Sequence, residues 1–412
     1  MKIYKTSKVP KDLSSVTTYN AYEETMPSEV GMRNDSVKKI WKSVEDLYKT
    51  GIYPAVSICI RKNDKIVLKR AIGHLKGNGP DDSPDAEKIL VTPDTPFCLF
   101  SASKSVTAML MHLLNQRGLI RMLDPVCHYI PEFGVHGKDK VRISDLICHK
   151  AGIPFTPTGT DKNILFNFDL CVKMLCEMKP RFTPGKHAAY HAVTAGFILG
   201  EIVKRVTGKN LNEFMRESIQ EPLGLRYFNY GAKKEDIKDI AINYNTGFPV
   251  FFPASVIAKR SLGVPWEMVA DISNEEDFLN CIIPSGNLIS TADESSIFYQ
   301  LLLNKGEING VKIFNPITIE RAVLRSAFVE IDRSLFFPTP YSLGFILGGS
   351  PVGIFGPYSE KSFGHLGFSN ILCWADPDRN ISVAIMSSGK PLFGHHLPLL
   401  VKMIYTICSC CK

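Results

Sequence analysis

The apolar positions of the chain follow a strand period near both ends and a helix period in the middle. Strand-like runs cover residues 54–60, 65–72, 341–347, 369–374 and 381–386. The first two runs are joined at Asn63-Asp64, a dipeptide typical of a hairpin. Strands at both ends with helices between them predict one sheet of the α/β (α+β) class, made of N- and C-terminal segments and carrying an inserted, mainly helical subdomain.

In the intervening segments, apolar residues recur at three- and four-residue steps, which is typical of helices with one buried face. The predicted helices cover residues 35–50, 141–152, 169–178, 192–207, 211–219, 291–303 and 397–407, besides a long one that follows Ser101. Residues 73–93 are expected to be a polar loop. Residues 231–280 have weak periodicity, and we expect an insertion or lid there that holds substrate specificity.

These patterns divide the chain into an arm and one domain. Residues 1–34 are polar and irregular, so we expect a loosely packed N-terminal arm. Residues 35–412 are expected to form a single domain. Its sheet part would comprise residues 35–100 and 341–412, and its helical part about residues 120–330, with the lid at 231–280.

The stretch FCLFSASKSVTAMLMHLLNQRGL, from residue 97 to 119, carries the most distinctive candidate chemistry. It places Ser101 at the mouth of a predicted helix and Lys104 one turn further in, so both side chains lie on one helix face. A serine hydroxyl is a poor nucleophile until a base takes its proton. A lysine can be that base only when it is neutral, and burial beside the positive end of a helix dipole lowers its pKa.

The Ser-x-x-Lys pattern alone does not establish a catalytic pair. It also begins at Ser36, Ser387 and Ser409, none of which opens a long buried helix. Ser101 could equally be an N-cap, because serines favour that position. Other parts of the chain have to decide between the two roles.

Two further stretches could complete a site around Ser101. Tyr190 follows the turn at Pro184-Gly185 and could relay the proton of Ser101 to a leaving group, provided that a nearby cation such as Lys104 lowers its pKa. The sequence GHLGF at residues 364–368 stands just before the predicted strand that begins at residue 369. Its small residues would let backbone N–H groups approach a ligand. The amides of Ser101 and Phe368 are the predicted oxyanion donors.

Composition and charge exclude several other classes of protein. The chain has 412 residues and a net charge of +7, with Lys and Arg scattered rather than clustered, which does not indicate nucleic-acid binding. The eleven cysteines lack metal-ligand spacing and are typical of a reducing compartment. No secretion signal and no bilayer-spanning apolar run occurs, so we expect a cytoplasmic enzyme. The tail does not match a prenylation pattern, but S-palmitoylation of Cys408, Cys410 and Cys411 would give weak membrane association.

The three motifs, taken in order, resemble the serine β-lactamase and penicillin-binding-protein-like family, in its esterase-like branch. The motifs are SASK from Ser101, Tyr190, and His365-Leu366-Gly367, and the resemblance extends over about residues 52–388. It is also carried by four connecting stretches: LDPVCHYIPEF, VRISDLICHKAGIP, GEIVKRVTGKNLNEF and IPSGNLISTADE.

The resemblance implies a β-lactamase/transpeptidase-like fold, with an antiparallel sheet flanked by helices. It further implies that Ser101 is acylated, that Lys104 and Tyr190 manage its proton, and that the N–H of Phe368 helps to hold the oxyanion. Gly367 and His365 would have supporting roles. No metal or organic cofactor is implied.

Two departures from the family pattern bear on the reaction. Ala192 stands where many members carry Asn, and Leu366 stands where antibiotic-hydrolysing members carry Thr. Both changes make the pocket more apolar. We therefore expect a serine hydrolase acting on carboxylic esters. A β-lactamase or D-peptidase, an acyltransferase using the same acyl-enzyme, and a non-catalytic relic of the fold are the alternatives. The expected partner is a small ester or amide substrate, and the sequence does not indicate an oligomeric state.

Overall fold

The computed structural model describes residues 4–157, 159–326 and 329–412. The α-helices are α1 (Ser36–Tyr48), α2 (Ser103–Gln116), α3 (Ile143–Ile147), α4 (Phe168–Glu177), α5 (Thr194–Thr207), α6 (Leu211–Met215), α7 (Ala254–Leu262), α8 (Trp266–Ile272), α9 (Glu276–Asn280), α10 (Ala292–Leu303), α11 (Pro316–Val323) and α12 (His396–Cys410). The 3-10 turns are η1 (Leu13–Val16), η2 (Ala21–Glu23), η3 (Pro27–Val30), η4 (Phe100–Ala102), η5 (Val126–His128), η6 (Pro131–Gly134), η7 (Lys162–Phe166) and η9 (Lys234–Asp239), and η8 (Arg216–Gln220) is a short π-helix.

The strands form one large sheet and several small ones. The large sheet contains β1 (Thr17–Tyr19), β2 (Ala55–Lys62), β3 (Lys65–Lys76), β4 (Ile89–Leu90), β12 (Ile346–Leu347), β15 (Phe363–Gly367), β16 (Ile371–Asp376) and β17 (Ile381–Ser387). The short pairings contain β5 (Phe97–Cys98), β6 (Asn229–Tyr230), β7 (Leu288–Ser290), β8 (Glu307–Ile308), β9 (Val311–Lys312), β10 (Glu330–Ile331), β11 (Pro338–Thr339), β13 (Val352–Gly353) and β14 (Gly356–Pro357).

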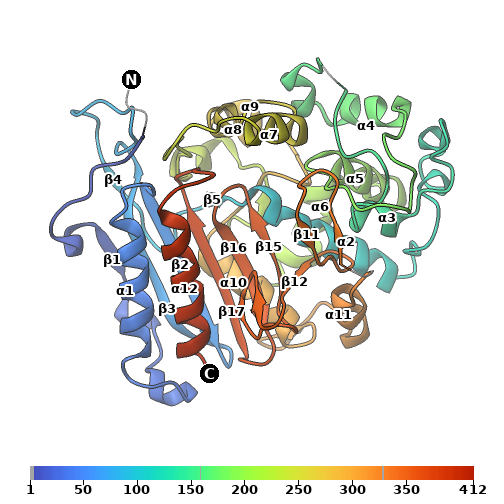
Figure 1. The fold of residues 1–412 in the computed structure, drawn as a ribbon. Helices are drawn as coiled ribbons and strands as arrows, with labels where there is room; N and C mark the ends of the chain where they lie inside the picture. Colours follow the sequence, from blue (N-terminus) through green and yellow to red (C-terminus); the bar gives the residue numbers. More distant parts are fainter. Residues whose placement is uncertain (1–3, 158, 327–328) are drawn as a thin grey trace.

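The large sheet joins the two ends of the chain, as the sequence predicts. Its strand order is β1-β3-β2-β17-β16-β15-β12, with β4 paired to β3, and every neighbouring pair is antiparallel. The N-terminal hairpin β2–β3 meets the C-terminal strands where Ile58 lies opposite Ile385. Figure 1 shows these strands side by side, with the helical part beside the edge formed by β15 and β12. The expected fold class is confirmed.

Helices cover both faces of the sheet because its central strands are buried on both sides. On one face, α1 and α12 pack against each other and over Ile58, Val383 and Trp374 (Figure 1). On the other face, α10 packs across β2, β16 and β17. The apolar stripe of α1, which includes Ile40 and Val44, is fully buried, as expected for a helix that contacts a core with one side.

The lead-in segment is more ordered than the sequence indicates. Its strand β1 extends the sheet, with Thr18 opposite Ala71 of β3. Val30 and Met32 are buried in the same core as α1. The described part of this segment is therefore packed against the sheet, whereas we expected a loose arm. It is attached by the pairing of β1 with β3, by its few apolar residues, and by the ion pairs of Glu24 with Arg70 and of Glu23 with Lys69.

Several strand boundaries differ from the prediction. Residues 363–367 form the strand β15, which the sequence did not predict, and the next strand begins at Ile371 rather than at 369. Ser369 and Asn370 have positive φ angles of 51° and 71°, so they form the turn between β15 and β16. The expected strand at 341–347 is reduced to β12, and β3 continues to Lys76 into the expected loop.

The predicted helices of the middle segment are present, and further ones occur. Residues 231–280 contain α7, α8 and α9, and α11 follows β9, all without a clear signal in the sequence. The predicted helix at 211–219 is the α6 helix continued by the π-turns of η8. The segment 231–280 is thus helical, and α8 supplies Trp266 to the neighbourhood of the site described below.

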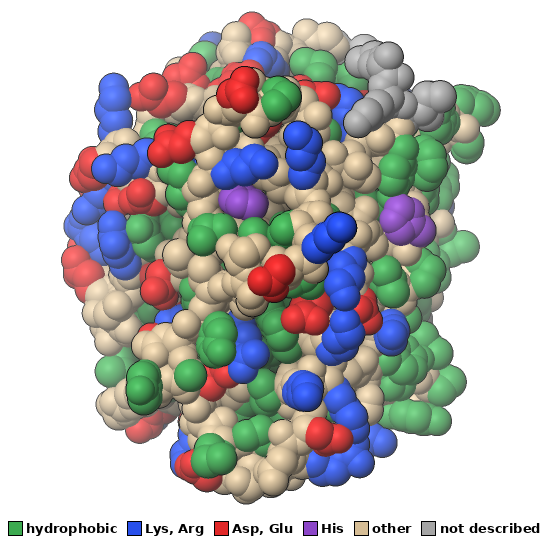
Figure 2. All heavy atoms as spheres, turned by 90° about the vertical axis from the view of Figure 1, so that its left-hand side faces the viewer, with side chains coloured by type: hydrophobic (Ala, Val, Ile, Leu, Met, Phe, Trp, Pro, Cys, Tyr) green, Lys and Arg blue, Asp and Glu red, His purple; other side chains and the backbone are tan. Residues whose placement is uncertain are grey.

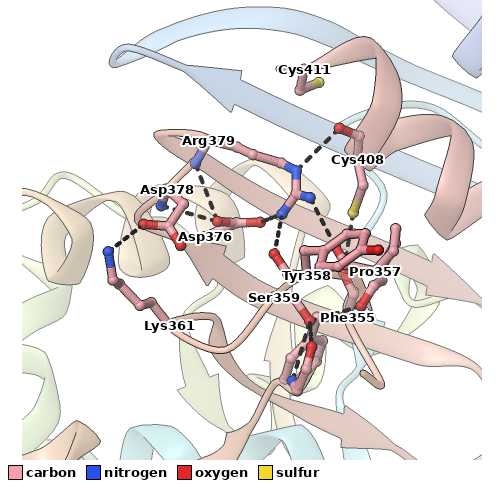
Figure 3. A network of polar contacts seen from close by, with 12 residues as sticks. Phe355, Pro357, Tyr358, Ser359, Lys361, Asp376, Asp378, Arg379, Cys408 and Cys411 are labelled. Atoms are coloured by element: carbon pink, nitrogen blue, oxygen red, sulfur yellow. Dashed lines mark hydrogen bonds and ion pairs between the residues drawn. The ribbon is translucent and has the colours of Figure 1, made fainter. Parts of the chain in front are cut away.

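The C-terminal helix α12 is fastened to the sheet by one buried guanidinium. Arg379, in the turn between β16 and β17, pairs with Asp376 at 2.5 Å and donates to the carbonyl oxygens of Cys408, Pro357 and Tyr358 (Figure 3). Lys62 adds a hydrogen bond of 3.2 Å to the carbonyl of Cys411. The contacts to Cys408 and Cys411 satisfy carbonyl groups that the end of a helix leaves without partners.

Because α12 is anchored in this way, the cysteines at its C-terminal end are not accessible to modification. Cys408, Cys410 and Cys411 are all buried, and the thiol of Cys408 donates to the carbonyl of Phe355 at 3.2 Å. Burial raises the pKa of Cys408 to about 11 and that of Cys411 to about 12. S-palmitoylation of the folded chain at these thiols, which the sequence left open, does not agree with this arrangement.

Basic and acidic side chains are mixed on the face that carries the N-terminal segment and α1. Figure 2 shows Lys and Arg side chains interspersed with Asp and Glu there. Ion pairs such as Lys39 with Asp35 and Lys42 with Asp46 on α1 contribute to this pattern. The face therefore does not present a uniform basic stripe of the kind that binds nucleic acid.

Candidate active site

Ser101 lies in the tight turn η4, between the short strand β5 and helix α2. The preceding residue, Phe100, has a positive φ of 47°, which is uncommon for a bulky residue and occurs often at functional sites. The Phe100 ring packs against the ring of Phe368, with centroids 5.4 Å apart. The side chain of Ser101 caps neither η4 nor α2, because their N-cap residues are Leu99 and Ala102. The alternative role of Ser101 as an N-cap is therefore excluded.

The hydroxyl of Ser101 faces the amine of Lys104. Lys104 Nζ lies 3.0 Å from Ser101 Oγ, and it also donates to the carbonyl oxygens of Ala192 at 2.6 Å and Ser285 at 3.0 Å. These carbonyls come from the segments before α5 and before β7, so three separate parts of the chain hold the amine. The helix places Lys104 in the first turn of α2, one turn beyond Ser101, as the spacing predicts.

Lys104 is buried without a carboxylate partner in the described part of the chain. Only 9% of its surface is exposed, and burial holds its pKa well below the usual value for lysine. The charged form of a lysine is disfavoured when it leaves water and no opposite charge compensates. The two carbonyl oxygens orient the amine but add no full negative charge. This environment favours a neutral amine that can accept a proton.

Tyr190 lies on the other side of the pair. Lys104 Nζ is 4.9 Å from the centre of the Tyr190 ring, and the Ser101 hydroxyl lies near enough to the phenol to affect its pKa. Burial raises the pKa of Tyr190, and the nearby Ser101 hydroxyl lowers it only in part. We expected Lys104 to lower this pKa as a cation. That expectation was wrong, because Lys104 is itself driven toward its neutral form.

The buried carboxylate of Asp332 holds the backbone of Tyr190 in place. Its Oδ1 accepts hydrogen bonds from the N–H of Tyr190 at 3.0 Å, Ser334 at 2.8 Å and Leu335 at 2.9 Å. Its Oδ2 accepts one from the hydroxyl of Tyr341 at 3.1 Å. A fully buried carboxylate with four donors is a rigid support, because each buried acceptor site is satisfied.

Two histidines pack behind Tyr190. The ring of His149 lies 4.7 Å from that of Tyr190 and 5.7 Å from that of His191. His191 Nε2 accepts from the N–H of Ile153 at 3.2 Å, and burial lowers the pKa of His191 to about 3. Both rings are therefore neutral near pH 7, since burial also holds the pKa of His149 well below its usual value. They pack against Tyr190 without bringing a charge to it.

The third motif lies on β15, next to the short edge strand β12 of the large sheet and near Ser101. Gly367 lies so close to the chain before Ser101 that an added Cβ would stand 2.4 Å from the carbonyl oxygen of Leu99. Only glycine allows this approach, which brings the end of β15 and the following Phe368 next to η4. His365 is buried, its Nδ1 donates to the carbonyl of Leu366 at 2.7 Å, and burial lowers its pKa to about 3.

A cavity of about 30 Å³ lies behind the serine–lysine pair, which is room for a water molecule. Its polar lining comprises Lys104, Thr107, His149, Ser285, Tyr341 and His365. Among the described residues, no group of three His, Cys, Asp or Glu side chains is placed to hold a metal ion. Within the same residues, no helix is both long enough and apolar enough to cross a membrane.

An antiparallel sheet with an inserted helical part and a Ser-x-x-Lys pair at their junction defines the class of β-lactamase and penicillin-binding-protein-like hydrolases. The chain belongs to the beta-lactamase family, whose model matches residues 42–400. It is similar to Esterase/beta-lactamase LipL of Mycobacterium tuberculosis, with 28% identity over 71% of this chain and 69% of the relative. It is also similar to a putative D-alanyl-D-alanine carboxypeptidase of Escherichia coli, with 28% identity over 92% and 87% of the two chains.

Solved structures share the fold over nearly the whole chain. A penicillin-binding protein homologue from Caulobacter crescentus superposes with a TM-score of 0.79 and 26% identity, over 92% of this chain and 98% of that one. A family VIII carboxylesterase superposes with a TM-score of 0.78 and 23% identity, over 92% and 99% of the two chains. The resemblance indicated by the three motifs is thereby confirmed at the level of family and fold.

Sequence reasoning missed the residues that support the three motifs. Asp332 gave no signal, because a single carboxylate in an irregular segment is typical of a surface. The carbonyl contacts of Ala192 and Ser285 to Lys104 also carry no residue-type signature, since any residue has a carbonyl. His149 lies in the stretch VRISDLICHKAGIP, which resembles the family, and that resemblance was the only available signal.

Proposed function

We propose that the protein is a serine hydrolase that forms an acyl-enzyme on Ser101 and hydrolyses carboxylic esters. The observation that carries this proposal is the buried amine of Lys104, 3.0 Å from Ser101 Oγ and held by two carbonyl oxygens. A lysine in this position can act as a general base at neutral pH, because burial removes the preference for its charged form.

In the acylation step, Ser101 Oγ attacks the ester carbonyl carbon while its proton passes to Lys104 Nζ. The carbonyl oxygens of Ala192 and Ser285, both within 3.0 Å, stabilise the ammonium group that forms. The bond between the carbonyl carbon and the alcohol oxygen then breaks. Tyr190, whose ring lies 4.9 Å from Lys104 Nζ, relays a proton to the departing alkoxide and is reprotonated from Lys104. Attack by water repeats the sequence and releases the acid.

The developing oxyanion is proposed to lie between the N–H groups of Ser101 and Phe368. The close approach of Gly367 to Leu99 brings the two segments together, and the contact of the Phe100 and Phe368 rings fixes them. Backbone donors held in this way need no rearrangement when the charge develops. Gly367 permits the approach, and His365 fills the space behind β15. Both act as supports rather than as proton carriers.

The residues around the pair favour an uncharged ester over a β-lactam or a peptide carboxylate. His365 is neutral because burial lowers its pKa to about 3, so the third motif offers no positive charge to a substrate carboxylate. Leu366 adds no hydroxyl there, and Ala192 contributes only its backbone carbonyl to Lys104. The name of the Mycobacterium relative, an esterase/beta-lactamase, supports the ester reaction and keeps β-lactam hydrolysis as an outcome to test.

Turnover of p-nitrophenyl butyrate and of nitrocefin, by the wild type and by Ser101→Ala, tests the proposal. We expect release of p-nitrophenol by the wild type, little hydrolysis of nitrocefin, and loss of the ester activity in Ser101→Ala. Preferred turnover of nitrocefin would indicate a β-lactamase instead. Failure to react with either substrate or with a fluorophosphonate probe would indicate a binding relic, whereas ester consumption only in the presence of an added alcohol or amine would indicate an acyltransferase.

A further inference from the structure

The turn of the β10–β11 hairpin presents apolar side chains to solvent. Ile331, Leu335, Phe336 and Phe337 are 40% to 66% exposed. Two hydrogen bonds close the turn, one from the N–H of Phe336 to the carbonyl of Asp332 at 2.8 Å and one from the N–H of Asp332 to the carbonyl of Phe337 at 3.0 Å. Phe336 has a positive φ of 57°, which is unfavourable for an aromatic residue. Exposed apolar groups that are gathered on a fixed turn mark an interaction surface.

Two segments that carry basic residues pack against this turn. The N–H of Arg333 donates to the carbonyl of Ala188 at 2.9 Å. The hydroxyl of Ser261, in α7, donates to the carbonyl of Ser334 at 3.3 Å (Figure 1). Neither residues 178–190 nor α7 contain Asp or Glu. The exposed basic residues of these segments and of the turn are Lys179, Arg181, Lys186, Lys259, Arg260 and Arg333.

The acidic residues of the hairpin do not offset these charges at the surface. Glu330 is paired with Lys150 at 2.5 Å. Asp332 is fully buried, and its carboxylate accepts hydrogen bonds from within the fold. The turn therefore combines exposed aromatic rings with a surrounding excess of positive charge. This combination is complementary to an anionic lipid surface, into which rings insert while basic side chains contact the headgroups.

The same turn is connected to the proposed proton relay by hydrogen bonds. The Asp332 carboxylate that receives the N–H groups of Ser334 and Leu335 also receives that of Tyr190 at 3.0 Å. The exposed ring of Phe336 follows Leu335 directly in the chain. A surface that binds the turn thus lies on the Tyr190 side of the candidate active site.

We propose that the β10–β11 hairpin docks the protein on an anionic lipid surface, and that its substrates are esters held in that surface. The substrate half of this inference rests on the proposed ester hydrolysis, whereas the docking does not. A lipid surface suits the short turn better than a folded partner does, because a stable protein interface takes about 20 residues from each side. Two aromatic rings with basic neighbours are enough for reversible lipid binding.

The docking is tested by sedimentation of the protein with phosphatidylcholine vesicles, with and without phosphatidylserine. We expect the wild type to bind the vesicles that contain phosphatidylserine and to bind the others more weakly. The double variant Phe336→Ser/Phe337→Ser should bind about 10- to 100-fold more weakly, because two rings no longer leave water on binding. Equal binding of the two proteins, or no binding by the wild type, would overturn the lipid site whether or not the protein hydrolyses esters.

Tyr22→Ser is the matched control. Tyr22 is fully exposed and lies in the lead-in segment near β1, whereas the hairpin lies near β12, at the opposite edge of the large sheet. Its replacement should leave vesicle binding unchanged. A dimer that only the wild type forms, without vesicle binding, would mean that the turn contacts a second copy of the chain and would overturn the lipid site.

The substrate half is tested with p-nitrophenyl palmitate dissolved in the same vesicles. At limiting lipid, its hydrolysis should fall in the double variant by the same factor as binding, while p-nitrophenyl butyrate in solution is hydrolysed at the wild-type rate. Equal hydrolysis of the palmitate by both proteins would overturn the link between docking and substrate. Vesicle binding without hydrolysis of either ester would instead overturn the proposed function and leave the docking in place.

Discussion

The proposed chemistry depends on the surroundings of a single amine. Lys104 Nζ has three polar contacts, to Ser101 Oγ and to the carbonyls of Ala192 and Ser285, and its pKa is held well below the usual value by burial. If a carboxylate lay beside it, the amine would stay charged and could not accept the proton of Ser101. The arrangement is that of a base rather than of an ion pair.

This environment predicts the pH dependence of the reaction. Lys104 must be neutral to act, so kcat/KM should rise with pH through the lowered pKa of Lys104 and then reach a plateau. Since burial lowers this pKa, the plateau should be reached well below the usual pKa of lysine, which is about 10.4. The measurement is the pH profile of kcat/KM for p-nitrophenyl butyrate. An ascending limb centred near the usual value would contradict the proposed base.

The matched variant is Lys104→Arg, which keeps the donors but cannot lose its proton. It should lose about 100- to 10,000-fold in kcat, the usual contribution of general-base catalysis, at every pH. An arginine variant that retained most of the activity would show that a positive donor is sufficient. Circular dichroism would confirm that the variant is folded.

The part of the site that could be predicted is the part that depends on the spacing of residues close together in the sequence. Ser101 and Lys104 are three apart at the start of one helix, and that periodicity is visible in the sequence. The groups that hold Lys104 and Tyr190, namely the carbonyls of Ala192 and Ser285 and the carboxylate of Asp332, come from distant segments. Their positions result from tertiary packing, which no local pattern specifies.

At the level of elements, the strand that carries the third motif was harder to predict than its neighbours. β15 carries the third motif, and its Gly-His-Leu-Gly composition gave no strand signal because small residues have low strand propensity. Pairing with β16 imposes the extended form on it. The apolar runs of β16, β17 and α12 were predicted correctly because they follow the period of their element and are buried.

Two ion pairs of the turn between β16 and β17 are expected to differ clearly in their contribution to the free energy of unfolding. Arg379 and Asp376 are 9% and 1% exposed, so Arg379→Met leaves a buried carboxylate without its partner and removes the hydrogen bond to the Cys408 carbonyl of α12. We expect a loss of about 3 kcal/mol in the free energy of unfolding. The measurement is urea denaturation followed by circular dichroism.

Lys361→Met is the control for this experiment. Its ion pair with Asp378 is adjacent in Figure 3 but lies at the surface, with Lys361 70% exposed. We expect no measurable change in the urea midpoint, because exposed pairs contribute little. Equal effects of the two substitutions would contradict the role of Arg379 as the anchor of α12.

At the scale of the whole molecule, two apolar cores enclose nearly all of the cysteines. The sheet is shared between a core under α1 and α12 and a larger core that extends into the helical part. Cys127 and Cys281 are half-buried, and the other nine of the eleven thiols are buried. The helices within residues 231–280, and α11 after β9, could not be predicted, because they are short and depend on contacts with these cores.

This distribution predicts the thiol reactivity of the native chain. Burial raises the pKa of Cys281 to about 12, and only a thiolate attacks a disulfide reagent. We therefore expect one rapidly reacting thiol with Ellman's reagent, Cys127, and all eleven after denaturation. Cys127→Ser should abolish the rapid phase. Rapid reaction of two or three thiols in that variant would mean that the C-terminal cysteines are exposed.

The proposed function depends on transfer of the ester's acyl group to Ser101. This transfer can be tested by the intact-protein mass shortly after mixing with p-nitrophenyl butyrate, followed by peptide mapping. We expect a butyryl adduct on the peptide that contains Ser101 in the wild type, its absence in Ser101→Ala, and no comparable adduct with nitrocefin. Ester hydrolysis that persists in Ser101→Ala, or an adduct on another residue, would contradict it.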